Sequence, residues 1–112
     1  MSQADVAAGF MEAMERRDWD AAFASFTERC RWHSPGTSME TVGREAAKRE
    51  FSAFVERTAA RYRVVEAHEY KNLTTLFFEG ETMNANERAS FPGVVIVRWE
   101  DGQVAELWGI RG

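Results

Sequence analysis

The sequence predicts an α+β domain in which N-terminal helices pack against a curved, mainly antiparallel sheet. In the first half of the chain, apolar residues recur every three or four positions, as they do on the buried face of a helix. From residue 61 onward they fall in long runs typical of strands. Asp101-Gly102 separates the last two runs and indicates a tight hairpin, because glycine accepts the positive φ that such a turn requires. Helices followed by a meander of strands define the α+β class.

Three helices are expected in the first sixty residues. The first follows Ser2, which can cap it, and places Phe10 and Met14 on one face. A short second helix opens at Asp18. The third runs from Gly43 to about residue 60, because its apolar residues repeat at three and four positions.

Five strands are expected. The first covers residues 30–34, where alternation turns Cys30, Trp32 and Ser34 to one side and Arg31 and His33 to the other. Pro35-Gly36 ends this strand, and a polar loop follows. The remaining strands are predicted over residues 61–70, 73–86, 91–100 and 103–111.

The composition fits one cytoplasmic domain over residues 1–112. A net charge of −4 disfavours nucleic acid or an anionic membrane as partner, because both bind preferentially to surfaces with clustered Lys and Arg. No apolar run approaches the roughly 18 residues of a membrane span. The single cysteine, Cys30, can form no intrachain disulfide, and no Cys/His cluster suggests zinc. We expect no metal site and no cofactor.

Four short motifs carry a resemblance to a known family. They are Asp18-Trp19-Asp20, Trp32-His33-Ser34-Pro35-Gly36, Gly43-Arg44-Glu45 and the segment from Trp99 to Leu107. In this order and spacing they resemble the SnoaL-like branch of the NTF2-like superfamily, over nearly the whole chain. The resemblance implies a cone-shaped α+β barrel, a pocket between the concave face of the sheet and the helices, and a homodimer through the opposite face.

Within that superfamily, the ketosteroid isomerases align best with this chain. Their general-base aspartate falls on Ser34, their oxyanion-hole tyrosine on Phe10 and their protonated aspartic acid on Val95. A serine of ordinary pKa cannot abstract a carbon-bound proton, and neither phenylalanine nor valine can donate a hydrogen bond to an enolate. Steroid isomerase chemistry is therefore not supported.

The resemblance also implies which residues line the pocket. Those expected around one apolar cavity, with Phe51 and Phe54 over its mouth, are Phe10, Met14, Trp32, Ser34, Val95, Val97 and Trp99. Arg111 is expected near the rim, where a guanidinium can hold a carboxylate or a carbonyl, or else is a solvated terminal arginine. Such a cavity would suit a hydrophobic small molecule, although the same side chains could simply fill the core.

The two histidines receive different predictions. Strand alternation turns His33 away from Ser34, toward the expected dimer surface that also holds Trp108. His68 shares a predicted strand face with Val64, and a histidine there could act as general acid or base if that face is concave. His68 and Ser34 are therefore the candidate catalytic residues.

Two functions remain open. The first is an isomerase, dehydratase or cyclase that works by acid/base chemistry, with His68 as proton carrier and Ser34 or Arg111 orienting the substrate. The second is a non-catalytic ligand-binding or dimerisation module that uses the same cavity. The ionisable groups that converge on the cavity discriminate between them.

Overall fold

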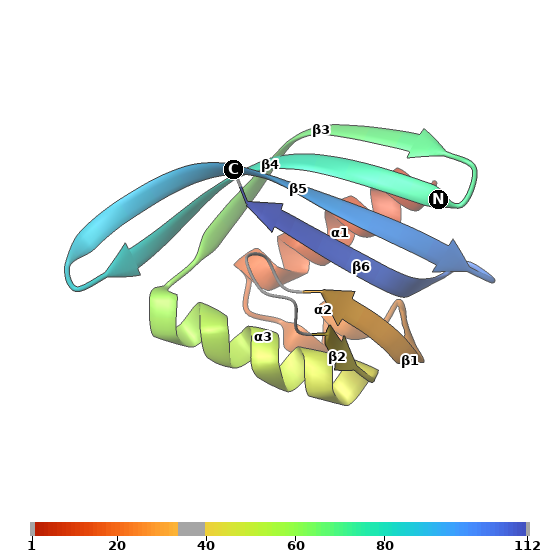
Figure 1. The fold of residues 1–112 in the computed structure, drawn as a ribbon, viewed down its shortest axis with the longest axis horizontal. Helices are drawn as coiled ribbons and strands as arrows, with labels where there is room; N and C mark the ends of the chain where they lie inside the picture. The colour runs from red at the N-terminus through yellow and green to blue at the C-terminus, as the bar shows by residue number, and fades with distance from the viewer. Residues whose placement is uncertain (1, 34–39, 112) are drawn as a thin grey trace.

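The computed structural model describes residues 2–33 and 40–111 (Figure 1). The predicted features at Ser34 and Pro35-Gly36 lie outside these residues. In chain order the elements are α1 (Gln3–Glu15), α2 (Trp19–Phe23), β1 (Phe26–His33), β2 (Glu40–Val42), α3 (Arg44–Thr58), β3 (Arg61–Tyr70), β4 (Leu73–Asn84), β5 (Glu87–Glu100) and β6 (Gln103–Arg111).

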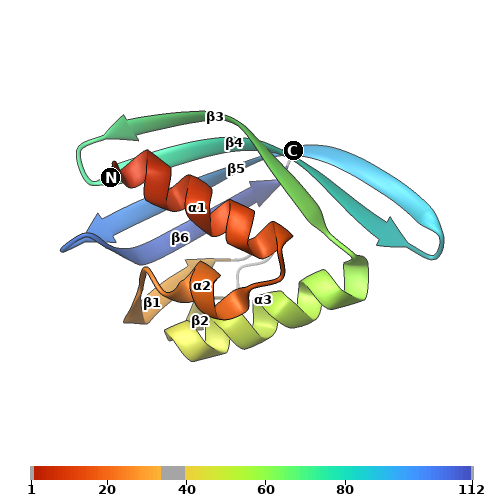
Figure 2. The ribbon, with the colours of Figure 1, turned by 180° about the vertical axis from the view of Figure 1, so that it is seen from behind.

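One six-stranded sheet organises the molecule, in the order β2-β1-β6-β5-β4-β3. Strands β3 to β6 form the predicted antiparallel meander, and β1 adds to it in parallel beside β6. Figure 2 shows α1 and α2 across one face of the bent sheet, with α3 along its lower edge. We call the helix-covered face the inner face and the opposite one the outer face. The predicted α+β architecture is confirmed.

The first helix begins as the sequence predicts. Ser2 Oγ accepts a hydrogen bond from the backbone N–H of Asp5 at 3.1 Å, and Asp5 Oδ2 accepts one from the N–H of Ser2 at 3.3 Å. This reciprocal pair satisfies two N–H groups that the first turn would otherwise leave without partners. Phe10 and Met14 of α1 are buried against the inner face, which confirms the predicted apolar stripe.

An aromatic cluster joins the helices to the sheet. The ring centroid of Phe10 lies 5.6 Å from that of Phe23, 5.2 Å from that of Phe26 and 6.2 Å from that of Trp32. These distances are typical of favourable aromatic pairs, which stabilise a core beyond the area they bury. The cluster fixes α1 and α2 over β1 and so defines one end of the space beneath the sheet.

Three strand boundaries differ from the prediction. Strand β1 begins at Phe26 rather than at residue 30, because a register shift between Phe26 and Arg31 breaks the alternation that would have revealed it. Strand β2 lies in the predicted polar loop and has only three residues. Strand β5 begins at Glu87 rather than at residue 91, since its first residues are exposed and carry no apolar pattern.

A bulge in β3 determines which side chains of that strand face the helices. Val64 lies opposite Phe78, but Glu66 lies opposite Phe77, so Val65 is the extra residue. Such a residue shifts the alternation by one position. An even-numbered residue before Val65 and an even-numbered residue after it therefore point to opposite faces of the sheet, and the same holds for odd-numbered residues.

The length and composition of the helices decide whether any of them could span a membrane. Within the described residues, no helix is both long and apolar enough to cross a bilayer.

Candidate functional site

A cavity of about 600 Å³ lies between α3 and the inner face of the sheet. Its walls are largely aromatic, and the aromatic side chains that line it are Trp32, Phe51, Phe54, Tyr62, Phe78 and Phe91. A volume of this size is within the range of small-molecule sites. The chain thus builds a roomy apolar space in the place predicted for a pocket.

Two glycines on the sheet allow the cavity floor to be aromatic. Across the β4–β5 pair, Gly80 lies opposite Phe91 and Gly93 lies opposite Phe78. A Cβ atom at Gly80 would meet the ring of Phe91 at 2.7 Å, and one at Gly93 would collide with the ring of Phe78. Each ring therefore lies close against the backbone of the neighbouring strand, an approach that only glycine permits.

A second, smaller space of about 50 Å³ adjoins the cavity, and most of its lining residues are buried. We call it the deep chamber. Its own walls come from α1, β5 and β6 and include Phe10, Met14, Val95 and Leu107. It shares four aromatic lining residues with the larger cavity, which are Trp32, Phe51, Tyr62 and Phe78.

Within the part of the chain that the structure describes, charged side chains line the larger of the two spaces only, and they are Arg49, Glu50, Arg57 and Arg111. The guanidinium carbon of Arg111 lies 4.0 Å from the ring centroid of Phe91, and that of Arg57 lies 5.7 Å from the centroid of Phe54. These are cation–π contacts, which orient the guanidinium groups on aromatic faces. Three arginines against one glutamate give this lining a surplus of positive charge.

Tyr62 is a functional candidate that the sequence analysis missed. Its ring packs edge-on against Phe78 with the centroids 5.4 Å apart, and its backbone N–H donates to Glu15 Oε1 at 2.6 Å. Burial raises the pKa of the Tyr62 hydroxyl to about 12, although the charge of Arg111 acts in the opposite direction. The hydroxyl therefore stays protonated at neutral pH and can donate a hydrogen bond to a ligand oxygen. Strand alternation puts Tyr62 on the same face as Val64, and this was the available signal.

Most of the expected pocket residues do line these spaces. Phe10, Met14 and Val95 line the deep chamber, Phe54 and Arg111 line the larger cavity, and Trp32 and Phe51 line both. Ser34 lies outside the described residues.

Val97 and Trp99 do not line either space and instead fill the core. They are 2% and 4% exposed and lie further along β5, beneath α1. The indole Nε1–H of Trp99 donates to Thr74 Oγ1 at 2.8 Å, which satisfies both groups inside the core. For these two residues the core-filling alternative is correct, because the inner face continues past the cavity.

His68 lies on the outer face, away from the cavity. It pairs with Thr75 across β3 and β4, its ring meets Phe77 edge-on at 6.0 Å, and 59% of its side chain is exposed. The expectation that it shares a face with Val64 is wrong, because the bulge at Val65 intervenes. Its Nε2 contacts Glu66 Oε1 at 3.0 Å in solvent rather than a cavity group.

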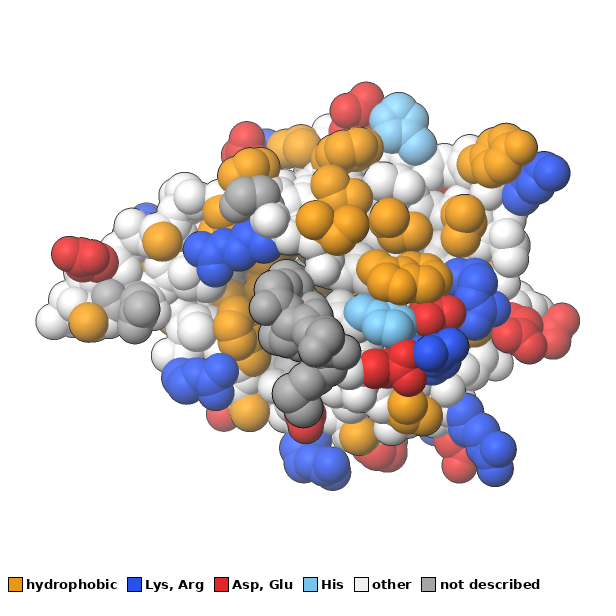
Figure 3. Space-filling view, viewed as in Figure 1, with side chains coloured by type: hydrophobic (Ala, Val, Ile, Leu, Met, Phe, Trp, Pro, Cys, Tyr) orange, Lys and Arg blue, Asp and Glu red, His pale blue; other side chains and the backbone are white. Residues whose placement is uncertain are grey.

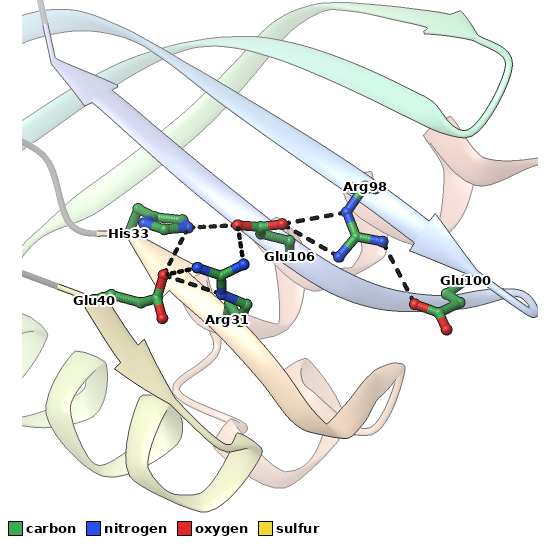
Figure 4. Close-up of polar contacts among 6 residues, drawn as sticks. All are labelled: Arg31, His33, Glu40, Arg98, Glu100 and Glu106. Carbon is green, nitrogen blue, oxygen red and sulfur yellow. Dashed lines mark hydrogen bonds and ion pairs between the residues drawn. The ribbon is translucent and has the colours of Figure 1, made fainter.

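His33 and Trp108 also lie on the outer face, the side to which alternation turned His33. The two rings stack with their centroids 5.4 Å apart and an interplanar angle of 3°. Beside them, Figure 4 shows a network of charged side chains that centres on Glu106. Glu106 Oε2 lies 2.6 Å from His33 Nε2, and its Oε1 accepts hydrogen bonds from Nε and Nη2 of Arg98, each at 3.2 Å.

Glu106 is the buried member of this network, with 7% of its surface exposed. Burial by itself would raise the pKa of this carboxyl, but hydrogen bonds from His33 and Arg98 and the charge of Arg31 outweigh it and hold the pKa below its ordinary value. His33, Glu40 and Glu106 offer ligand atoms within 4.8 Å of one another. Arginines already pair with both carboxylates, Arg31 with Glu40 and Arg98 with Glu106, so the network neutralises itself.

Helices packed on one face of a bent sheet, with an aromatic cavity between them, define an NTF2-like α+β protein. A family model for the SnoaL-like domain matches residues 7–107, and the chain belongs to this family. A search of curated proteins found no match.

Solved structures share this fold at low sequence identity. An NTF2-like protein of unknown function from Burkholderia pseudomallei is 20% identical with a TM-score of 0.88, and the match covers 100% of this chain and 92% of that one. TerC, co-crystallized with polyporic acid, is 15% identical with a TM-score of 0.86, over 96% and 89% of the two chains. A protein from Sinorhizobium meliloti described as a candidate polyketide cyclase is 15% identical with a TM-score of 0.78, over 94% and 93%.

Proposed function

We propose that this protein binds a hydrophobic, aromatic small molecule that carries an anionic group, in the cavity between α3 and the inner face of the sheet. The observation that carries the proposal is the combination of six aromatic walls with three arginines and a single glutamate. Aromatic walls favour flat apolar ligands, and guanidinium groups favour carboxylates or phenolates. The co-crystallization of TerC with polyporic acid agrees with such a ligand in a protein of the same fold.

Arg111 and Tyr62 are the groups best placed to hold the anionic end. Arg111 carries a permanent charge and is already oriented by the ring of Phe91. The Tyr62 hydroxyl adds a donor that stays protonated at neutral pH. A ligand oxygen between them would receive one charged and one neutral hydrogen bond, in a site whose aromatic walls limit competition from water.

Acid/base catalysis is the second candidate function. Tyr62 favours it, because a neutral donor in an apolar cavity can stabilise an enolate that forms from a ketone. Among the described lining residues, however, no histidine reaches the cavity and Glu50 is the one carboxylate, on the exposed surface of α3. The described residues therefore favour binding over proton abstraction from carbon.

A pair of matched dyes tests the proposal. 8-Anilinonaphthalene-1-sulfonate is aromatic and anionic, and N-phenyl-1-naphthylamine is the same molecule without the sulfonate. We expect the anionic dye to bind at one site and more tightly than the neutral dye. Phe51→Ala should weaken its binding about tenfold or more, which corresponds to the loss of about 1.4 kcal/mol of contact. Phe77→Ala, on the outer face, is the matched control and should leave binding unchanged.

A different pattern would contradict the proposal. If the dye signal survived Phe51→Ala but disappeared with Phe77→Ala, the ligand site would be on the outer face. Each variant must first show a cooperative thermal transition, because partly unfolded chains also bind this dye.

A further inference from the structure

We propose that the deep chamber is a specificity pocket for a short apolar substituent of the ligand, so that preferred ligands are amphiphiles with an alkyl end inward and an anionic end at Arg111. This inference rests on the proposed function and adds the shape of the ligand to it. The lining residues that the two spaces share and their opposite chemical character together carry it.

The two spaces adjoin through shared walls. Trp32, Phe51 and Tyr62 line both of them, as does Phe78. A ring held among these aromatic side chains would face α3 on one side and the deep chamber on the other. A substituent on that ring would therefore lie beside the deep chamber.

The chemical character changes between the two spaces. The larger cavity carries three arginines and one glutamate, whereas none of the described residues that line the deep chamber is charged. Met14, Val95 and Leu107 supply apolar walls there, and each is less than 9% exposed. A polar group that entered would lose its hydrogen bonds to water without replacement, so only an apolar group gains by entering.

The size of the deep chamber limits what enters. Its volume of about 50 Å³ is small beside the 600 Å³ of the larger cavity, so it suits a few carbon atoms rather than a second ring. Each methylene that leaves water contributes about 0.8 kcal/mol, which is about fourfold in affinity. We therefore expect affinity to rise over the first carbons of a chain and then stop rising.

A homologous series of 4-alkylbenzoates tests this expectation. The carboxylate and the alkyl chain lie at opposite ends of the ring, as the proposal requires of a ligand with its anionic end at Arg111 and its alkyl end in the deep chamber. Displacement of 8-anilinonaphthalene-1-sulfonate by benzoate and its 4-methyl to 4-butyl derivatives gives each affinity. The expected profile rises about fourfold per carbon at first and then levels or falls within the series.

Substitutions at Val95 can either enlarge or reduce the volume of the deep chamber. Val95→Ala enlarges it and should move the best chain to a longer member, whereas Val95→Leu fills it and should move the best chain to a shorter one. Val94→Ala and Val94→Leu are the matched controls, because the neighbouring residue points to the outer face and should not shift the profile. Arg111→Gln should weaken every benzoate by the same factor and leave the gain per carbon unchanged.

The outcomes separate the two proposals. Suppose that the benzoates bind and that Arg111→Gln weakens them, but that affinity does not depend on chain length or that the Val95 variants do not shift the profile. In that case the deep chamber is not a specificity pocket, and the proposed function stands. If neither the benzoates nor the anionic dye binds the folded protein, both proposals are overturned. Thermal unfolding of each Val95 variant confirms that a changed profile comes from a folded chain.

Discussion

Glu106 lies almost buried on the outer face of the sheet with its Oε2 atom 2.6 Å from His33 Nε2. The opposite oxygen of the same carboxylate receives both hydrogen bonds from Arg98. One carboxylate thus ties β1, which holds His33, to β5 and β6. This tie crosses the only parallel strand pair among the described strands.

The lowered pKa of Glu106 predicts a loss of stability in acid. A carboxyl whose pKa is lower in the folded chain than in the unfolded chain stabilises the fold above its ordinary pKa. That contribution disappears as the pH falls through the lowered value. We expect the urea midpoint to fall between roughly pH 5 and pH 3, and Glu106→Gln to flatten this dependence.

The same variant should also lower stability at pH 7. Glu106→Gln leaves charged partners without their carboxylate, at a cost of about 1–3 kcal/mol. Glu100→Gln is the control, because Glu100 pairs with Arg98 in an exposed contact at 3.4 Å and such pairs contribute little. Equal urea midpoints for the two variants across this pH range would contradict the role given to Glu106.

Gly93→Ala should distort the cavity floor. The new Cβ would collide with the ring of Phe78, which is buried and lines the cavity. Overpacking of this kind costs about 1–3 kcal/mol. We expect a lower melting temperature together with weaker binding of 8-anilinonaphthalene-1-sulfonate. Gly9→Ala is the control, since a Cβ at this exposed position of α1 meets no atom within 4 Å. It should leave dye binding unchanged and raise the melting temperature slightly, because alanine favours a helix over glycine.

The ionisation of Tyr62 can be observed directly. The chain has two tyrosines, so Tyr70→Phe leaves Tyr62 as the single phenol. We expect its absorbance near 295 nm to rise with a midpoint at about pH 12, because burial opposes the phenolate. A midpoint near the ordinary value of about 10, in a chain that circular dichroism shows to be folded, would mean that the ring is open to water.

The homodimer expected from the family resemblance stays a prediction. Figure 3 shows apolar side chains gathered over the outer face, and the exposed ones from β3, β4 and β6 include Val65, Tyr70, Phe77 and Ile110. If a second copy covers them, light scattering should give twice 12.8 kDa, and Ile110→Asp should restore the single mass. Met83→Asp, at the distant β4–β5 hairpin, should leave the mass unchanged. A wild-type chain that is monomeric at high concentration would contradict the prediction.

The sequence predicted the fold well because the fold depends on local patterns. Capping at Ser2, the apolar stripe through Phe10 and Met14, and the Asp101-Gly102 turn each act within a few residues, and the structure confirms them. Strand β2 escaped prediction because its three residues are held by pairing with β1 and not by any pattern of their own.

The site was predicted only where alternation runs unbroken. Along β5 and β6 it placed Val95 and Arg111 correctly on the inner face. Along β3 one extra residue turns His68 to the face opposite the predicted one. No local sequence pattern indicates a bulge at Val65. Tyr62 was missed because its raised pKa and its place in the cavity wall depend on burial by residues of three other elements. Only the folded chain brings these residues together.

The bulge at Val65 also affects how this strand can be compared with its relatives. In a related chain without the extra residue, an ungapped alignment through β3 would match every residue from 66 to 70 with one that points to the opposite face. Conserved interior positions would then appear to be replaced by surface residues such as His68. A one-residue gap at Val65 restores the correspondence between side chains that point to the same face.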